Sequence, residues 1–113
     1  MSFQTYQEAT LDTAVYPGAG EGDLGAIVYT TLGLAGEAGE IPNKVKKILR
    51  DSGGTITKET REAISKEIGD VLWYVARLAD ELGYNLGYIA EENLDKLESR
   101  VARGVLGGSG DDR

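Results

Sequence analysis

The stretch KEIGDVLWYVARLADELG, residues 66–83, decides the fold class of this chain. Apolar residues recur within it and just before it at intervals of three and four positions: Ile64, Ile68, Val71, Val75, Leu78 and Leu82. This interval is the period of an amphipathic α-helix and does not fit a strand. The spacing therefore predicts a helix over residues 57–83 with one face turned toward a core.

Three other segments are also predicted to be helical, covering residues 2–15, 24–51 and 86–103. The linkers YPGAGEGD (16–23) and DSGGTIT (51–57) are rich in glycine and separate them, and Asn85 suits the N-cap of the last helix. Short connections between amphipathic helices favour a bundle. We therefore expect one all-α, four-helix bundle-like domain over residues 1–103, followed by a glycine-rich tail, residues 104–113.

Composition narrows the chemistry of the 113-residue chain. It contains no cysteine and no histidine, which excludes disulfides, thiolate catalysis, iron–sulfur clusters, imidazole zinc sites and a Ser-His-Asp triad. A metal ion would need oxygen ligands, which favours Mg²⁺, Mn²⁺ or Ca²⁺. The net charge of −7 argues against binding to a nucleic-acid polymer. The sequence shows neither a long apolar run nor a basic segment followed by an apolar one at its start. We therefore expect no membrane association and a cytoplasmic location.

Acidic residues three positions apart occur on two of the predicted helices. Glu37 and Glu40 lie in GLAGEAGEIPNKVKK, residues 33–47, and Glu67 and Asp70 lie in the 57–83 helix. Residues at this spacing share a helix face, so two packed helices can gather four carboxylates around hard cations. The alternative is an ordinary solvated face, because a chain with 19 acidic residues contains such pairs by chance.

The first acidic pair lies in an unusual helical context. Gly33, Gly36 and Gly39 surround it, and each glycine costs an exposed helix about 1 kcal/mol relative to alanine. We interpret these small residues as a surface against which the 57–83 helix packs closely. Pro42 has no amide proton, so we expect a kink or break between Gly39 and Pro42.

The segments GLAGEAGEIPNKVKKILRD, KEIGDVLWYVARLADELG and IAEENLDKLESR, with the tail RG…GSGDDR, resemble the MazG-like all-α nucleoside triphosphate pyrophosphohydrolases. The hallmark of that family is Glu-Glu-x-x-Glu on one helix and Glu-x-x-Asp on the next, with Asn-x-x-Lys downstream. The resemblance covers about residues 24–113. It implies Mg²⁺-dependent hydrolysis of a (deoxy)nucleoside triphosphate to the monophosphate and pyrophosphate, with Mn²⁺ as a substitute ion.

The resemblance also implies roles for individual residues. Glu37, Glu40, Glu67 and Asp70 become the metal ligands, and one of the two glutamates of the first helix activates water. Phosphate binding falls to Asn93 and Lys96, and the nearby cations Lys44, Lys47 and Arg100 are further candidates. Such an enzyme would control the nucleotide pool or remove unwanted nucleotides, in a cell or a phage.

One position departs from the family pattern. Gly36 stands where the longer form of the motif has its first glutamate. The alternative function is therefore a catalytically weak or inactive helical module that binds nucleotides or a protein partner.

Recognition of the base is assigned to aromatic and amide side chains, namely Tyr74, Trp73, Tyr6 and Gln7. Trp73 lies opposite the apolar stripe of its helix, and for this side chain we favour cover by a partner subunit over contact with the base. Together with the small size of the chain, this favours a homodimer or homotetramer.

Overall fold

The computed structural model describes all 113 residues, and every regular element is helical. The elements are α1 (Phe3–Ala9), the 3₁₀-helix η1 (Thr10–Thr13), α2 (Leu24–Asp51), α3 (Lys58–Glu81) and α4 (Leu86–Ala102). The all-α prediction is confirmed, and the boundaries of α2, α3 and α4 fall within two residues of the predicted ones. The helix predicted over residues 2–15 is instead the short α-helix α1 followed directly by the 3₁₀-helix η1. No helix is long and apolar enough to cross a bilayer.

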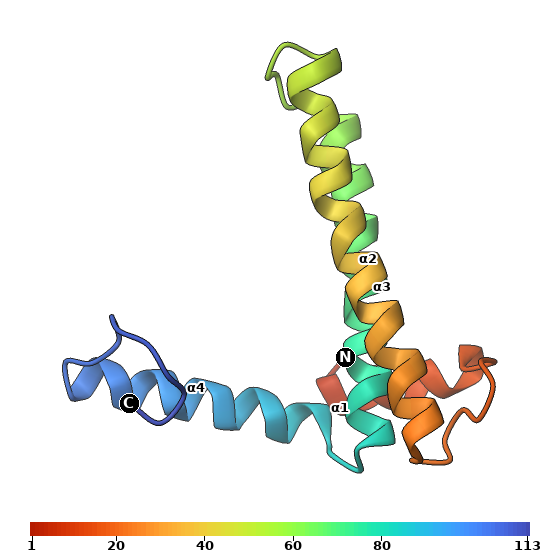
Figure 1. Ribbon diagram of the computed structural model, residues 1–113, viewed down its shortest axis with the longest axis vertical. Helices are drawn as coiled ribbons and strands as arrows, with labels where there is room; N and C mark the ends of the chain where they lie inside the picture. The colour runs from red at the N-terminus through yellow and green to blue at the C-terminus, as the bar shows by residue number, and fades with distance from the viewer.

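Helices α2 and α3 form a long antiparallel hairpin, which dominates the molecule (Figure 1). Side chains cap the helix starts: Asp23 accepts from the Ala26 amide at 3.0 Å, and Thr57 and Thr60 cap each other reciprocally. The predicted N-cap Asn85 accepts from the Gly87 amide at the start of α4. The predicted break in α2 does not occur, because the helix runs unbroken through Pro42. Proline removes only one hydrogen bond of the ladder, and packing against α3 continues on both sides of it.

Helix α4 leaves the end of α3 and points away from the hairpin (Figure 1). It contacts α1 and α3 and makes no contact with α2. The molecule is consequently open: its radius of gyration is 17.1 Å, whereas a compact chain of this length has about 13 Å.

The core of the single chain is small. Only 12 of the 113 residues are buried, and half of these are polar or charged. Several residues of the predicted apolar stripes remain open to solvent, including Ile68 at 55% exposure, Leu94 at 57% and Val101 at 62%. The stripes therefore extend beyond what the chain itself can cover.

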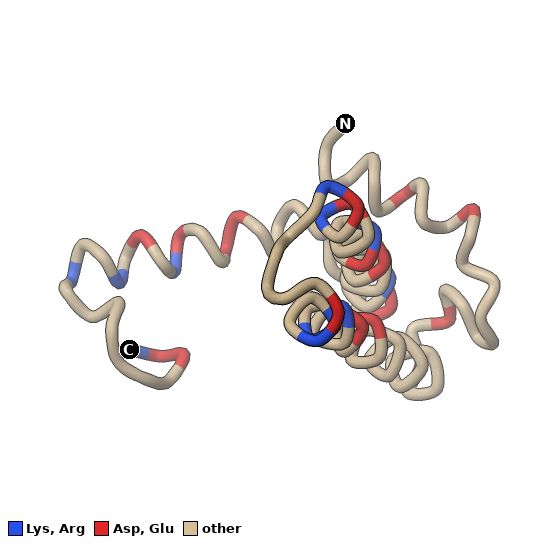
Figure 2. Tube along the Cα trace, turned by 90° about the horizontal axis from the view of Figure 1, so that it is seen from above, with Lys and Arg blue, Asp and Glu red and all other residues tan.

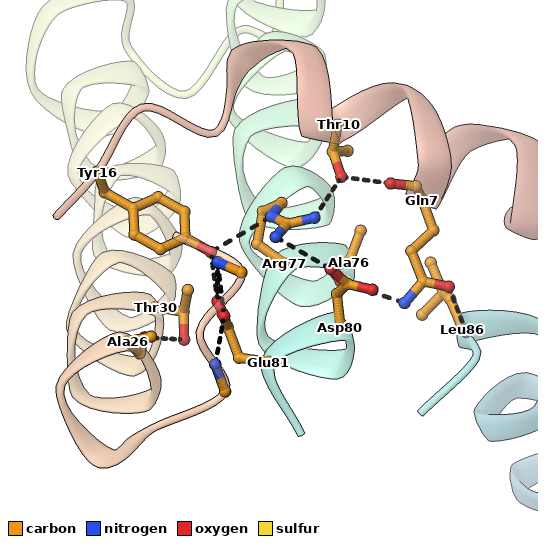
Figure 3. A network of polar contacts seen from close by, with 12 residues as sticks. Gln7, Thr10, Tyr16, Ala26, Thr30, Ala76, Arg77, Asp80, Glu81 and Leu86 are labelled. Atoms are coloured by element: carbon orange, nitrogen blue, oxygen red, sulfur yellow. Dashed lines mark hydrogen bonds and ion pairs between the residues drawn. The ribbon is translucent and has the colours of Figure 1, made fainter. Parts of the chain in front are cut away.

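A buried polar network fastens the N-terminal segment to α3 (Figure 3). Arg77 is fully buried and donates to the Tyr16 hydroxyl at 3.3 Å and to Thr10 at 3.4 Å. Its Nη2 lies 3.1 Å from Asp80 as an ion pair, but outside hydrogen-bonding geometry. Glu81 accepts from Tyr16 at 2.9 Å and from the amides of residues 20 and 22. These contacts fix the loop between η1 and α2 against the hairpin.

Candidate metal centre

Three carboxylates from two helices meet on the hairpin. One oxygen each of Glu37 on α2 and of Glu67 and Asp70 on α3 lie within 4.8 Å of one another. Glu37 and Glu67 are half-buried, whereas Asp70 is exposed. Glu40 is exposed one turn further along α2 and lies outside this group. The structure thus brings together three of the four predicted metal ligands.

The local electrostatics suit a cation. Burial, followed by the negative charges of Asp70 and Glu67, raises the pKa of Glu37. Lys44 supplies a positive charge, with its Nζ 3.6 Å from Oε1 of Glu67. Further acidic residues lie along both helices of the hairpin (Figure 2). Carboxylate oxygens are the ligands that Mg²⁺ prefers, and binding a divalent ion would relieve the repulsion among them. The residues present therefore fit Mg²⁺.

Close helix packing beside the cluster depends on one glycine. A Cβ atom at Gly33 would lie 2.1 Å from Cε1 of Tyr74, so the Tyr74 ring occupies the space that a side chain would need. A Cβ at Gly36 or Gly39 would meet nothing within 4 Å. Our interpretation of the three glycines as a packing surface is therefore correct for Gly33 and wrong for the other two.

An aromatic cluster adjoins the acids. The Tyr16 and Tyr29 rings stack with centroids 5.0 Å apart, and Trp73 meets Tyr16 edge-on at 6.2 Å and Tyr74 edge-on at 4.9 Å. The Trp73 indole donates to the Thr13 hydroxyl at 2.8 Å. The N-terminal segment of the same chain therefore contacts Trp73, where we expected a partner subunit.

The four residues predicted to recognise the base have different surroundings. Tyr74 borders the acids: burial raises its pKa, and the charges of Glu37 and Asp70 add to this effect. Burial, and after it the negative charge of Asp70, raises the pKa of Tyr6.

Gln7, in contrast, is buried with its amide already engaged. Its nitrogen donates to the carbonyls of Ala76 at 3.4 Å and Tyr84 at 2.9 Å, and its oxygen accepts from the Leu86 amide at 3.0 Å. Gln7 thus joins α1, α3 and α4, and its amide is not free to contact a base.

The predicted phosphate-binding residues divide between two regions. Lys44 lies at the acid cluster, and Lys47 is exposed further along α2. Asn93, Lys96 and Arg100 all belong to α4, which does not contact α2. One chain therefore does not bring the cations of α4 to the acids.

Sequence patterns did not single out Arg77, Glu81 and Tyr16, which form a buried polar network. The available signal is the spacing of Arg77 and Glu81, opposite charges four positions apart near Ala76 and Ala79. Such a pair also occurs on solvated helices, so its burial depends on the N-terminal segment that covers it.

A carboxylate cluster between two antiparallel helices, in a chain without histidine or cysteine, agrees with the comparison to known families. Residues 28–104 match the sequence model of the MazG nucleotide pyrophosphohydrolase domain. The chain belongs to this family. The MazG match spans nearly all of α2, together with α3 and α4, and includes all three clustered acids.

The chain is also similar to the Gene 37 protein of Mycobacterium phage L5. The two are 55% identical over 114 residues, and the alignment covers the whole of both chains. No solved structure matches the chain.

Proposed function

We propose that this MazG-family protein hydrolyses a (deoxy)nucleoside triphosphate to the monophosphate and pyrophosphate in the presence of Mg²⁺, with Mn²⁺ able to substitute. The observation that carries the proposal is the convergence of Glu37, Glu67 and Asp70 from two helices. Membership of the family supports the reaction class. The similarity to a phage protein favours a role in a phage nucleotide pool.

In this proposal Glu37, Glu67 and Asp70 hold the ion. When bound, Mg²⁺ neutralises phosphate charge and lowers the pKa of bound water. The neighbouring Lys44, 3.6 Å from Glu67, is placed to contact a phosphate group beside the acids. Its charge would favour the pyrophosphate leaving group.

The two glutamates of α2 take different roles in this scheme. Glu37 belongs to the cluster, whereas Glu40 lies one turn away with its carboxylate exposed. A carboxylate free of metal can accept the proton of the water that attacks the α-phosphorus. We therefore assign proton acceptance to Glu40 and metal binding to Glu37.

Phosphate contacts from α4 require a second copy of the chain. Within one chain α4 points away from the hairpin and makes no contact with α2. The exposed apolar residues of both regions support the proposal that a second copy covers them. In the proposed homo-oligomer, Asn93, Lys96 and Arg100 of one subunit approach the acids of its neighbour.

The base is proposed to contact the aromatic side chains next to the acids. The Tyr74 ring lies at Gly33, one turn from Glu37, and Trp73 packs edge-on against Tyr74 at 4.9 Å. The charge of Asp70 also acts on Tyr6 and raises its pKa, after burial. Aromatic rings offer stacking surfaces for any base, so this cluster by itself selects no particular nucleotide.

Three variants test the proposal. Release of pyrophosphate from a panel of eight NTPs and dNTPs is measured with Mg²⁺ and with EDTA, alongside calorimetric binding of Mg²⁺. Glu67→Ala should lose both turnover and Mg²⁺ binding, because it removes a ligand. Glu40→Gln should bind Mg²⁺ normally and lose turnover by about 100-fold or more, the range typical of a lost general base. The control is Glu62→Ala, which removes an exposed acid of the same helix α3 and should change neither quantity.

The outcomes separate the two functions considered. No pyrophosphate release by the wild type from any nucleotide would contradict the enzyme and favour the binding module, which Gly36 in place of a motif glutamate supports. Full turnover by Glu67→Ala would contradict the metal centre. Normal turnover by Glu40→Gln would contradict the assigned base alone.

A further inference from the structure

The C-terminal tail folds back along α4 and places a carboxylate on two cations. Lys96 donates to Oδ1 of Asp111 at 2.8 Å, and Arg100 donates to the same oxygen at 3.0 Å. Arg100 also donates to the Asp111 carbonyl at 2.7 Å. Two cations one helical turn apart thus meet on a single anionic oxygen, which is the geometry of an anion site.

The burial of these groups is uneven. The Arg100 side chain is only 5% exposed, whereas the Asp111 side chain is 79% exposed. No other element reaches this end of α4, so the tail is what covers Arg100 (Figure 1). The buried Nε of Arg100 has no hydrogen-bond partner. The tail therefore covers a guanidinium whose donors it does not fully satisfy.

A glycine turn and a few arginine hydrogen bonds hold the rest of the tail in place. Gly104 adopts a φ of +71° where the chain turns back at the end of α4. Arg113 donates to the carbonyls of Val105 at 3.2 Å and Leu106 at 2.9 Å, and Arg103 donates to an Arg113 oxygen at 2.7 Å. Two of these three hydrogen bonds are exposed to solvent, where water competes for the same donors.

We propose that Asp111 occupies an anion site formed by Lys96 and Arg100, and that a phosphate group of the ligand displaces it. The identity of that ligand rests on the proposed function. A pyrophosphate group has more charge and more oxygen acceptors than one carboxylate, so it can also reach the unsatisfied donor of Arg100. The Asp111 carboxylate is attached to the same chain, so it is present at a high local concentration and competes with pyrophosphate for the two cations. Only the fraction of molecules with the tail released binds the anion, which lowers the apparent affinity.

Binding of inorganic pyrophosphate in metal-free buffer tests this competition by calorimetry. Asp111→Asn removes the charge with almost no change of shape, and we expect pyrophosphate to bind about three- to tenfold more tightly. Asp112→Asn, the matched control, removes the neighbouring exposed carboxylate and should leave the affinity unchanged. Equal or weaker binding by Asp111→Asn would overturn the proposal and show that Asp111 positions the two cations instead. Absence of binding by both the wild type and Asp111→Asn would overturn it as well.

A second measurement follows the tail itself. Because the chain has no cysteine, Ser109→Cys provides a single attachment point for a spin label. We expect pyrophosphate to sharpen the spectrum as the tail is released, whereas an unchanged spectrum at saturating pyrophosphate would contradict displacement. These readouts need neither Mg²⁺ nor turnover. They can therefore support displacement of Asp111 even when the Glu67→Ala test contradicts the metal centre. They can also contradict displacement when that test supports the metal centre.

Discussion

At the scale of single residues, the glycines of α2 have different functions although the sequence shows them as equivalent. At Gly33 the Tyr74 ring occupies the space that a side chain would need, and this ring borders the acid cluster. Gly36 lies three positions further along with open space around it. The same residue type is thus required for packing at one position and unfavourable for the helix at the other.

Alanine substitutions should separate these roles. Gly36→Ala should raise the free energy of unfolding by up to about 1 kcal/mol, because alanine favours the helix and meets no neighbour. Gly33→Ala should lower it by about 1–3 kcal/mol, because the ring of Tyr74 must move. Urea unfolding followed by circular dichroism measures both. Equal effects of the two substitutions would contradict the assigned packing.

At the scale of elements, the hairpin and the N-terminal segment are held together by a buried charge. Arg77 of α3 contacts Tyr16 and Thr10, and Tyr16 stacks on Tyr29 of α2. The network therefore positions the aromatic cluster beside the acids as well as attaching α1 and η1. Gln7 adds a second connection, from α1 to the start of α4.

Removal of Arg77 should be costly. Arg77→Met is expected to lower the free energy of unfolding by about 1–3 kcal/mol, because the Tyr16 and Thr10 hydroxyls lose a buried hydrogen-bond donor. Arg61→Met, which changes an exposed arginine of the same helix, should alter it by less than about 0.5 kcal/mol. Thermal unfolding of both variants provides the comparison, and similar unfolding temperatures would contradict a stabilising role for the network.

At the scale of the whole molecule, the open shape leaves apolar surface without a partner. A groove along α4 and the tail has a volume of about 400 Å³ and is almost entirely apolar. It is lined by Leu94, Leu97, Glu98, Val101, Ala102 and Leu106. A radius of gyration of 17.1 Å with 12 buried residues leaves a single chain with little core of its own.

We therefore expect a homodimer or homotetramer in solution. The double substitution Leu94→Asp and Val101→Asp should convert it to a species of the 12.1 kDa chain mass, because both residues lie in the apolar groove. Ser99→Asp adds a negative charge at an exposed position of α4 and should leave the assembly unchanged. Sedimentation equilibrium measures the masses. A monomeric wild type would contradict the prediction.

The sequence by itself determined the helices, because the apolar period and the capping residues act locally. It also indicated Glu37, Glu67 and Asp70, because an i, i+3 pair on each of two helices can converge when the helices pack. Tertiary structure alone decided which glycine packs against Tyr74, that Arg77 is buried, and that Asp111 neutralises Lys96 and Arg100. Those outcomes depend on which segments, distant in sequence, cover a given helix face, and helical periodicity contains no information about the covering segment.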